Sequence, residues 1–197
     1  MFRTAWPILL AALLLSGCAA FRDTDETVDW SQQKLFTEAT DEMDAGNYEK
    51  AIKYYEILES RYPFGKYAHQ AQLNVAYAYY RFQEPESALA AADRFIKLHP
   101  NHPATAYAYY LRAKAAAASY GRSPEQIDRS ISAYQKAIEL DPNNPNTHFV
   151  LGNAFDEKGL IDDAILAWRR VIDLSPNDVD AHNNLGIAYE NTGRPAE

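Results

Sequence analysis

The chain contains 197 residues, of which 47% are hydrophobic, 13% aromatic and 23% charged, and its formal net charge is −8. This composition is that of a globular protein and excludes a largely disordered chain. The acidic balance argues against nucleic acid as a partner, because that binding depends on lysine and arginine at phosphates. The single cysteine excludes a disulfide framework and a CxxC metal or redox site.

The N-terminus contains an apolar run from Ala5 to Leu15. It is shorter than the roughly 20 residues of a membrane-spanning helix, so it predicts a secretory signal peptide. The run ends in a motif that resembles the bacterial lipobox, Leu15-Ser16-Gly17-Cys18. We therefore expect a signal peptide over residues 1–17 and a lipid on Cys18. A plain signal peptide with an incidental cysteine is the alternative.

The residues after Cys18 predict the destination of the chain. Ala19 follows the cysteine, and in the enterobacterial lipoproteins that the motif resembles this position favours the outer membrane. Residues 18–30 are rich in acidic side chains and poor in apolar ones, which predicts a solvated acidic tether. We expect an outer-membrane protein that is lipid-anchored on the periplasmic face.

The body of the chain contains a repeat. Four similar phrases end in proline, at intervals of 37, 42 and 34 residues, and a tetratricopeptide repeat (TPR) is about 34 residues long. They are Arg61-Tyr62-Pro63, Leu98-His99-Pro100, Leu140-Asp141-Pro142 and Leu174-Ser175-Pro176. The phrases predict an all-α TPR superhelix, with helix pairs at about 31–62, 66–99, 103–140 and 147–175.

Residues 145–178 fit the repeat pattern best. Gly152 and Ala164 are small, which lets the two helices of the repeat approach closely, and Trp168 fills the space between them. A last helix is expected from about Val179. No second helix follows it in this sequence, so the last repeat is predicted to be incomplete, with Leu185 and Tyr189 exposed.

Several phrases in the front half are longer than the repeat pattern requires. Over residues 15–112 they resemble, in order, the BamD family of TPR lipoproteins in β-barrel assembly. They include Arg61-Tyr62-Pro63-Phe64-Gly65, Tyr77-Ala78-Tyr79-Tyr80, Asp93-Arg94-Phe95-Ile96-Lys97-Leu98 and Tyr107-Ala108-Tyr109-Tyr110-Leu111-Arg112. Residues 113–197 resemble only general TPR sequence and carry more excess negative charge than residues 31–112. We therefore predict two regions, and a back half that does not bind the barrel-forming subunit as the family does.

The first helix of each pair lines the groove of a TPR array, and helical spacing selects the candidates for it. They are Phe36, Thr40, Met43, Leu73, Tyr77, Tyr80 and Arg81. Tyrosine offers a rigid ring and a hydroxyl at low entropy cost, which suits an extended peptide. The alternative is that most of these rings are core residues.

A secondary groove is predicted at Asn153 and Asn184, which resemble two members of the carboxylate clamp of some TPR proteins. Phe149 stands where the clamp has a lysine, and asparagine is also common in the repeat itself. We expect no cofactor, no metal site and no catalytic site. His99 and His102 lie in a proline-bounded turn without a third ligand at metal-site spacing.

The BamD resemblance implies a non-enzymatic scaffold for the assembly and insertion of outer-membrane β-barrel proteins. Its partners would be unfolded outer-membrane proteins, other subunits of the assembly machinery, and the outer membrane itself through the anchor. The alternatives are a pilotin-like TPR lipoprotein for pilus or secretin assembly and a general periplasmic TPR adaptor.

We predict that Cys18→Ser abolishes lipid labelling and globomycin-sensitive processing, because the thiol is the site of the thioether. Metabolic labelling with palmitate and membrane fractionation measure the effect. Unchanged labelling and membrane retention in the variant would contradict the anchor.

Overall fold

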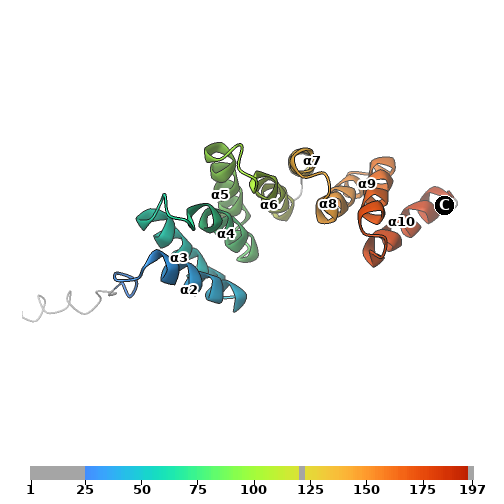
Figure 1. The fold of residues 1–197 in the computed structure, drawn as a ribbon. Helices are drawn as coiled ribbons and strands as arrows, with labels where there is room; N and C mark the ends of the chain where they lie inside the picture. Colours follow the sequence, from blue (N-terminus) through green and yellow to red (C-terminus); the bar gives the residue numbers. More distant parts are fainter. Residues whose placement is uncertain (1–24, 120–122, 195–197) are drawn as a thin grey trace, which may run out of the picture. The chain divides into compact units, whose positions relative to one another are not determined.

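The structure is a computed structural model that describes residues 25–119 and 123–194. These residues contain helices and turns and no strand, so the predicted all-α fold is confirmed (Figure 1). The predicted signal peptide and Cys18 lie outside the described residues. The chain divides into two compact units, Met1–Ser31 and Gln32–Glu197. In the first unit, the Asp25 carboxylate accepts hydrogen bonds from the backbone and hydroxyl of Thr27.

The second unit is a succession of helices that follow the predicted pairs. They are α2 (Gln32–Asp44), α3 (Tyr48–Arg61), α4 (Ala68–Arg81), α5 (Pro85–Leu98), α6 (Thr105–Ala118), α7 (Pro124–Leu140), α8 (Pro145–Glu157), α9 (Ile161–Leu174) and α10 (Val179–Thr192). Each helix packs on its neighbours in the chain, and α4 also contacts α6, the first helix of the next pair. This is the packing expected of a TPR array.

Local sequence explains where the helices start. Proline opens α5, α7 and α8, where its missing N–H costs no helical hydrogen bond. Ser123 and Gln126 form a reciprocal capping box at the start of α7. The turn between α8 and α9 needs a left-handed residue, which Gly159 supplies with a φ of +80°.

The core between paired helices depends on small residues that face large rings. Gly152 on α8 meets Trp168 on α9, which is 3% exposed. A Cβ atom on Gly152 would lie 2.5 Å from Nε1 of that indole. The close approach predicted for this pair is therefore present, and the glycine is needed for it.

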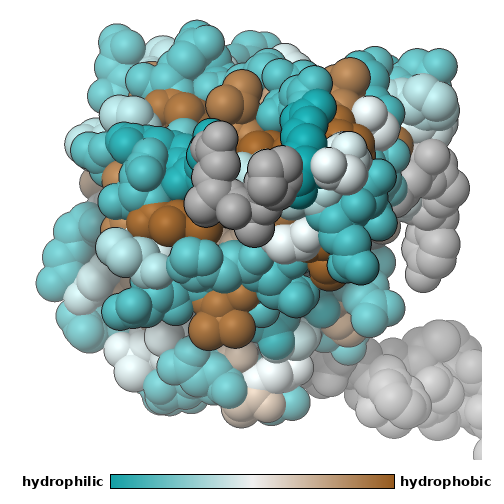
Figure 2. All heavy atoms as spheres, turned by 90° about the vertical axis from the view of Figure 1, so that its right-hand side faces the viewer, coloured by the Kyte–Doolittle hydropathy of each residue, from teal (hydrophilic) through white to brown (hydrophobic). Residues whose placement is uncertain are grey.

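The last helix differs from the sequence-based expectation. Leu185 is 7% exposed and packs in one cluster with Ile165 and Trp168 of α9, while Tyr189 is half-buried against the same cluster. The predicted exposure of Leu185 is therefore wrong, because its side of α10 faces α9. Exposed apolar side chains on α9 and α10 include Leu166, Val179 and Ile187. Figure 2 shows hydrophobic atoms on this side as separate patches among hydrophilic ones.

Gly152 and Gly186 occupy the same Leu-Gly position of α8 and α10 and form a matched pair. Apart from its chain neighbours and the backbone of its own helix, no atom of the described chain lies within 4 Å of a Cβ built on Gly186. We predict that Gly152→Ala lowers the free energy of unfolding by about 1–3 kcal/mol through overpacking. Gly186→Ala should raise it by up to about 1 kcal/mol through helix propensity. Urea unfolding followed by circular dichroism measures both, and equal effects would contradict the close packing at Gly152.

Candidate peptide-binding groove

The C-terminal half of α4 carries a cation between two tyrosine rings. The guanidinium carbon of Arg81 lies 4.9 Å from the centroid of the Tyr48 ring and 5.7 Å from that of Tyr77. Its Nη1 donates a 2.7 Å hydrogen bond to the Tyr77 hydroxyl, which raises the pKa of Arg81. A cation over an aromatic face is attracted by the quadrupole of the ring. The contacts hold the exposed Arg81 side chain at a fixed place.

A second cation of this kind lies on α6. The ammonium of Lys114 is 5.2 Å from the centroid of the Tyr80 ring on α4 and 5.9 Å from that of Tyr110. Tyr110 stacks on Tyr107 with centroids 5.9 Å apart, and it meets Tyr134 of α7 at 6.2 Å. A band of tyrosine rings therefore runs from α4 across α6 to α7 with Lys114 on it, and Arg81 lies on Tyr77 of the same α4.

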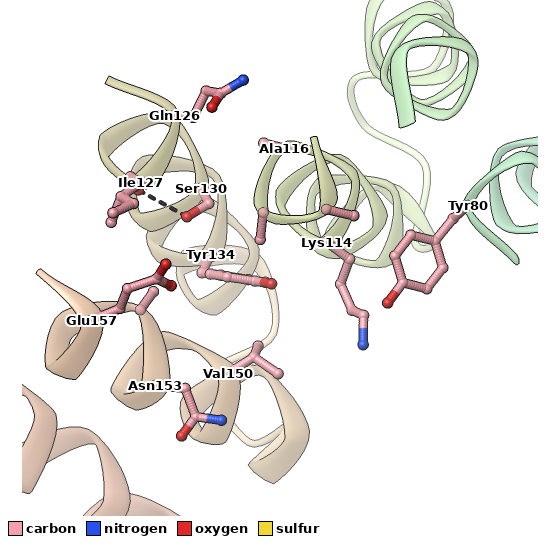
Figure 3. A pocket seen from close by; sticks show the side chains of 13 residues that line it. Tyr80, Lys114, Ala116, Gln126, Ile127, Ser130, Tyr134, Val150, Asn153 and Glu157 are labelled. Atoms are coloured by element: carbon pink, nitrogen blue, oxygen red, sulfur yellow. Dashed lines mark hydrogen bonds between the residues drawn. The ribbon is translucent and has the colours of Figure 1, made fainter. Parts of the chain in front are cut away.

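A cavity of about 550 Å³ opens beside this band, between Tyr80, α6, α7 and α8 (Figure 3). One wall is the alanine stretch 116–118, and Ile127 and Val150 add apolar surface. Its charged side chains are Lys114 and Glu157, which Figure 3 shows on opposite sides. The volume is within the range of ligand pockets, and mixed apolar and polar walls are typical of them.

Asn153 connects this cavity to the next helix pair. Its Oδ1 accepts hydrogen bonds from Nε1 of Trp168 at 3.0 Å and from Nδ2 of Asn184 at 3.1 Å. The two predicted asparagines are therefore adjacent, and together they line a smaller cavity of about 200 Å³. Phe149, at the position of the clamp lysine, packs on the core cluster of α9.

The remaining predicted groove residues lie elsewhere in the array. Phe36 stacks on Tyr67 with centroids 4.5 Å apart, and the Thr40 hydroxyl lies 2.9 Å from that of Tyr55. Met43 is half-buried near the end of α2. The structure places Tyr80 against Lys114 of α6 and Arg81 against Tyr77 and Tyr48, and it leaves Phe36, Thr40 and Met43 on the first helix pair.

Leu73 is a core residue and needs correction as a groove candidate. It is 2% exposed and packs with Phe95 and Ala108. Helical spacing places it on the same stripe of α4 as Tyr77 and Tyr80. The end of α5 and the start of α6 cover the first turns of α4, however, so only the later turns reach the groove.

Sequence reasoning missed Lys114, Tyr110 and Tyr134. The signal was present for two of them, because Lys114 follows Tyr110 by four residues and so shares its helix face. The alanines around Lys114 were interpreted as the start of general repeat sequence. Tyr134 is on the second helix of its pair, to which the groove rule assigns a core role.

Comparison with known proteins identifies the family. The sequence model of YfiO, described as an outer membrane lipoprotein, matches residues 28–151. The chain belongs to the YfiO family. A general TPR model matches residues 152–193. The family match continues beyond Arg112, so the change to general repeat sequence comes later than predicted.

One similar protein is the outer membrane protein assembly factor BamD of Neisseria gonorrhoeae. It is 42% identical over 153 residues, and the alignment covers 70% of this chain and 57% of the relative. The chain thus spans a little over half the length of that protein. None of the described helices of this YfiO-family chain is long and apolar enough to cross a membrane.

Solved structures confirm the TPR fold. MamA is similar with a TM-score of 0.67 at 24% identity, covering 79% of this chain and 84% of MamA. YrrB, described as a TPR protein with an unusual peptide-binding site, has a TM-score of 0.61 at 17% identity. That likeness covers 83% of this chain and 78% of YrrB. At these identities the likeness concerns the fold.

A separate cavity of about 780 Å³, between α3, α4 and α5, lies at a cluster of imidazoles. The ring of His69 is 4.3 Å from that of His99 and 4.8 Å from that of His102, centroid to centroid. Nε2 of His99 lies 2.9 Å from Oε1 of Gln72, and Nδ1 of His102 accepts a hydrogen bond from the Ala104 backbone. Among the described residues, no group of three or more His, Cys, Asp or Glu could hold a metal ion.

The imidazole cluster predicts acid sensitivity. Burial lowers the pKa of His99, and His69 and His102 lower it further. The unfolded chain therefore binds more protons, so the stability that the neutral cluster contributes is present above the ordinary histidine pKa and is lost as the pH falls. We predict that the urea midpoint decreases as the pH is lowered from about 7 to about 5, and that the decrease is smaller in the His69→Gln variant.

His148→Gln is the matched control, because Nε2 of His148 lies 2.9 Å from the carbonyl oxygen of Pro142 in a turn. This variant should keep the full acid dependence of the wild type. A His69→Gln protein with an unchanged pH profile would show that the three rings do not act together.

Proposed function

We propose that this chain is a non-enzymatic scaffold in the assembly and insertion of outer-membrane β-barrel proteins, and that it binds unfolded client segments in its groove. The observation that carries the proposal is the tyrosine band with Arg81 and Lys114 beside an open cavity. Membership of the YfiO family and 42% identity to a relative named outer membrane protein assembly factor support the cellular process.

The groove suits reversible capture of extended segments. Its rings are fixed by stacking and by contact with the two cations, so little side-chain entropy is lost on binding. Tyrosine hydroxyls and the amide of Asn153 provide polar partners for a peptide backbone, while the cavity accepts a side chain. In the same fold, YrrB is described as having a peptide-binding site.

We also propose that Cys18 anchors the chain to the periplasmic face of the outer membrane, near the other subunits of the assembly machinery. The family description as an outer membrane lipoprotein and the motif that ends at Cys18 support this location. Residues 152–193 match the general repeat model, which supports a partner surface different from that of the family's barrel-docking region.

The partners can be tested by affinity purification of the tagged full chain from detergent-solubilised outer membrane. We predict that barrel-assembly subunits co-purify, and that binding to the isolated periplasmic domains of the barrel-forming subunit is weak. Recovery of secretin or pilus subunits instead would favour the pilotin-like alternative. Tight binding to the isolated domains would contradict the changed partner surface.

Replacement of both Tyr77 and Arg81 by alanine tests the groove. We predict about a tenfold or larger loss of affinity for C-terminal peptides of barrel proteins, because aromatic and arginine anchors carry most binding energy. Fluorescence anisotropy and the melting temperature are measured together. Arg94→Ala is the control, because Arg94 is an exposed residue of α5 that pairs with Glu59 of α3. Lost stability with unchanged affinity would assign the pair to the core.

A further inference from the structure

In the part of this acidic protein that the structure describes, several basic side chains pair with carboxylates, and the two groove cations do not. Arg94 pairs with Glu59 at 2.9 Å, and Arg112 pairs with Asp93 at 2.7 Å. Lys50, Lys136, Lys158 and Arg194 also pair with carboxylates. Within the described residues, Arg81 and Lys114 contact tyrosines and no carboxylate. The groove therefore holds two positive charges that the described chain does not neutralise.

Neither cation is buried beyond the reach of a ligand. Arg81 is exposed, and Lys114 is half-buried at the edge of the cavity. A tyrosine face attracts a cation without neutralising its charge, so the open side can still accept an anion. Glu157, the carboxylate in the same cavity, is exposed and lies across the cavity from Lys114 (Figure 3).

The apolar part of the cavity adds a second requirement on the ligand. Its alanine wall, Ile127 and Val150 leave space for one apolar or aromatic side chain near Lys114. Since α4 and α6 are in contact, their axes are about 8–10 Å apart. About three residues of an extended peptide cover that distance.

We propose that the groove binds an acidic extended segment, which places one carboxylate side chain at Arg81 and a second at Lys114 and inserts an apolar side chain into the cavity next to Lys114. The inference rests on the proposed function and specifies its ligand. Acidic side chains fit better than a chain end, because a terminus supplies one carboxylate and the groove presents two separate cations. The charge of the ligand is thus complementary to that of the groove.

The probe is an acetylated and amidated fluorescent peptide with two glutamates about three residues apart and a phenylalanine next to one of them. The glutamine version of the same peptide lacks the charges. A third peptide keeps the glutamines and has a free C-terminal carboxylate. Affinity of the full chain for each is measured by anisotropy at low and high salt.

We expect the glutamate peptide to bind about tenfold more tightly than the glutamine peptide, with a smaller difference at high salt. Lys114→Met keeps the apolar stem and removes the charge, so it should remove most of the difference, and Arg81→Met should act in the same direction. Lys136→Met, which removes an exposed lysine paired with Glu139 on α7, should leave it unchanged. Circular dichroism and melting verify that each variant is folded.

Equal binding of the glutamate and glutamine peptides would overturn the inference and leave the proposed function standing. Binding of the free-acid peptide as tightly as the glutamate peptide would overturn it in favour of a chain end. Binding of none of the peptides, at any salt concentration, would overturn both the inference and the proposed groove.

Discussion

The close approach of paired helices is the constraint on which the rest of the array depends. In the pair α8 and α9 a small residue on one helix faces a large ring on the other, Gly152 against Trp168, and the two helices pack closely there. That contact fixes the spacing of α8 and α9. Asn153, the next residue after the glycine, is then held by the same indole through a 3.0 Å hydrogen bond. Trp168 thus contributes both to the core of this pair and to the position of Asn153 at the cavity.

The charged side chains of the groove differ in their partners from those of the outer surfaces. On the outer surfaces, cations and carboxylates lie side by side and screen one another, which contributes little to stability. In the groove, Arg81 and Lys114 lie on tyrosine rings. The rings position the charges without cancelling them. A chain with an overall negative charge therefore retains two positive side chains in its groove, Arg81 and Lys114.

The sequence predicted the helix pairs and the repeat type because both depend on short-range patterns. Proline, glycine and alanine recur at fixed positions, and each has a local physical reason. The groove was predicted in part. Helical periodicity gives the stripe on which Leu73, Tyr77 and Tyr80 lie, but the crossing of α5 and α6 over the first turns of α4 decides which of them is covered. The sequence spacing relates Lys114 to Tyr110, but its contact with Tyr80 depends on the packing of α4 against α6.

The alanine wall of the cavity, residues 116–118, has a mechanical consequence. Methyl groups cannot change rotamer, so this wall cannot move aside for a larger guest. The width of the opening is set by how far α6 stands from α7 and α8, which the packed rings between those helices determine. On this side, therefore, the size of the side chain that the cavity admits depends on the spacing of the helices rather than on side-chain rearrangement.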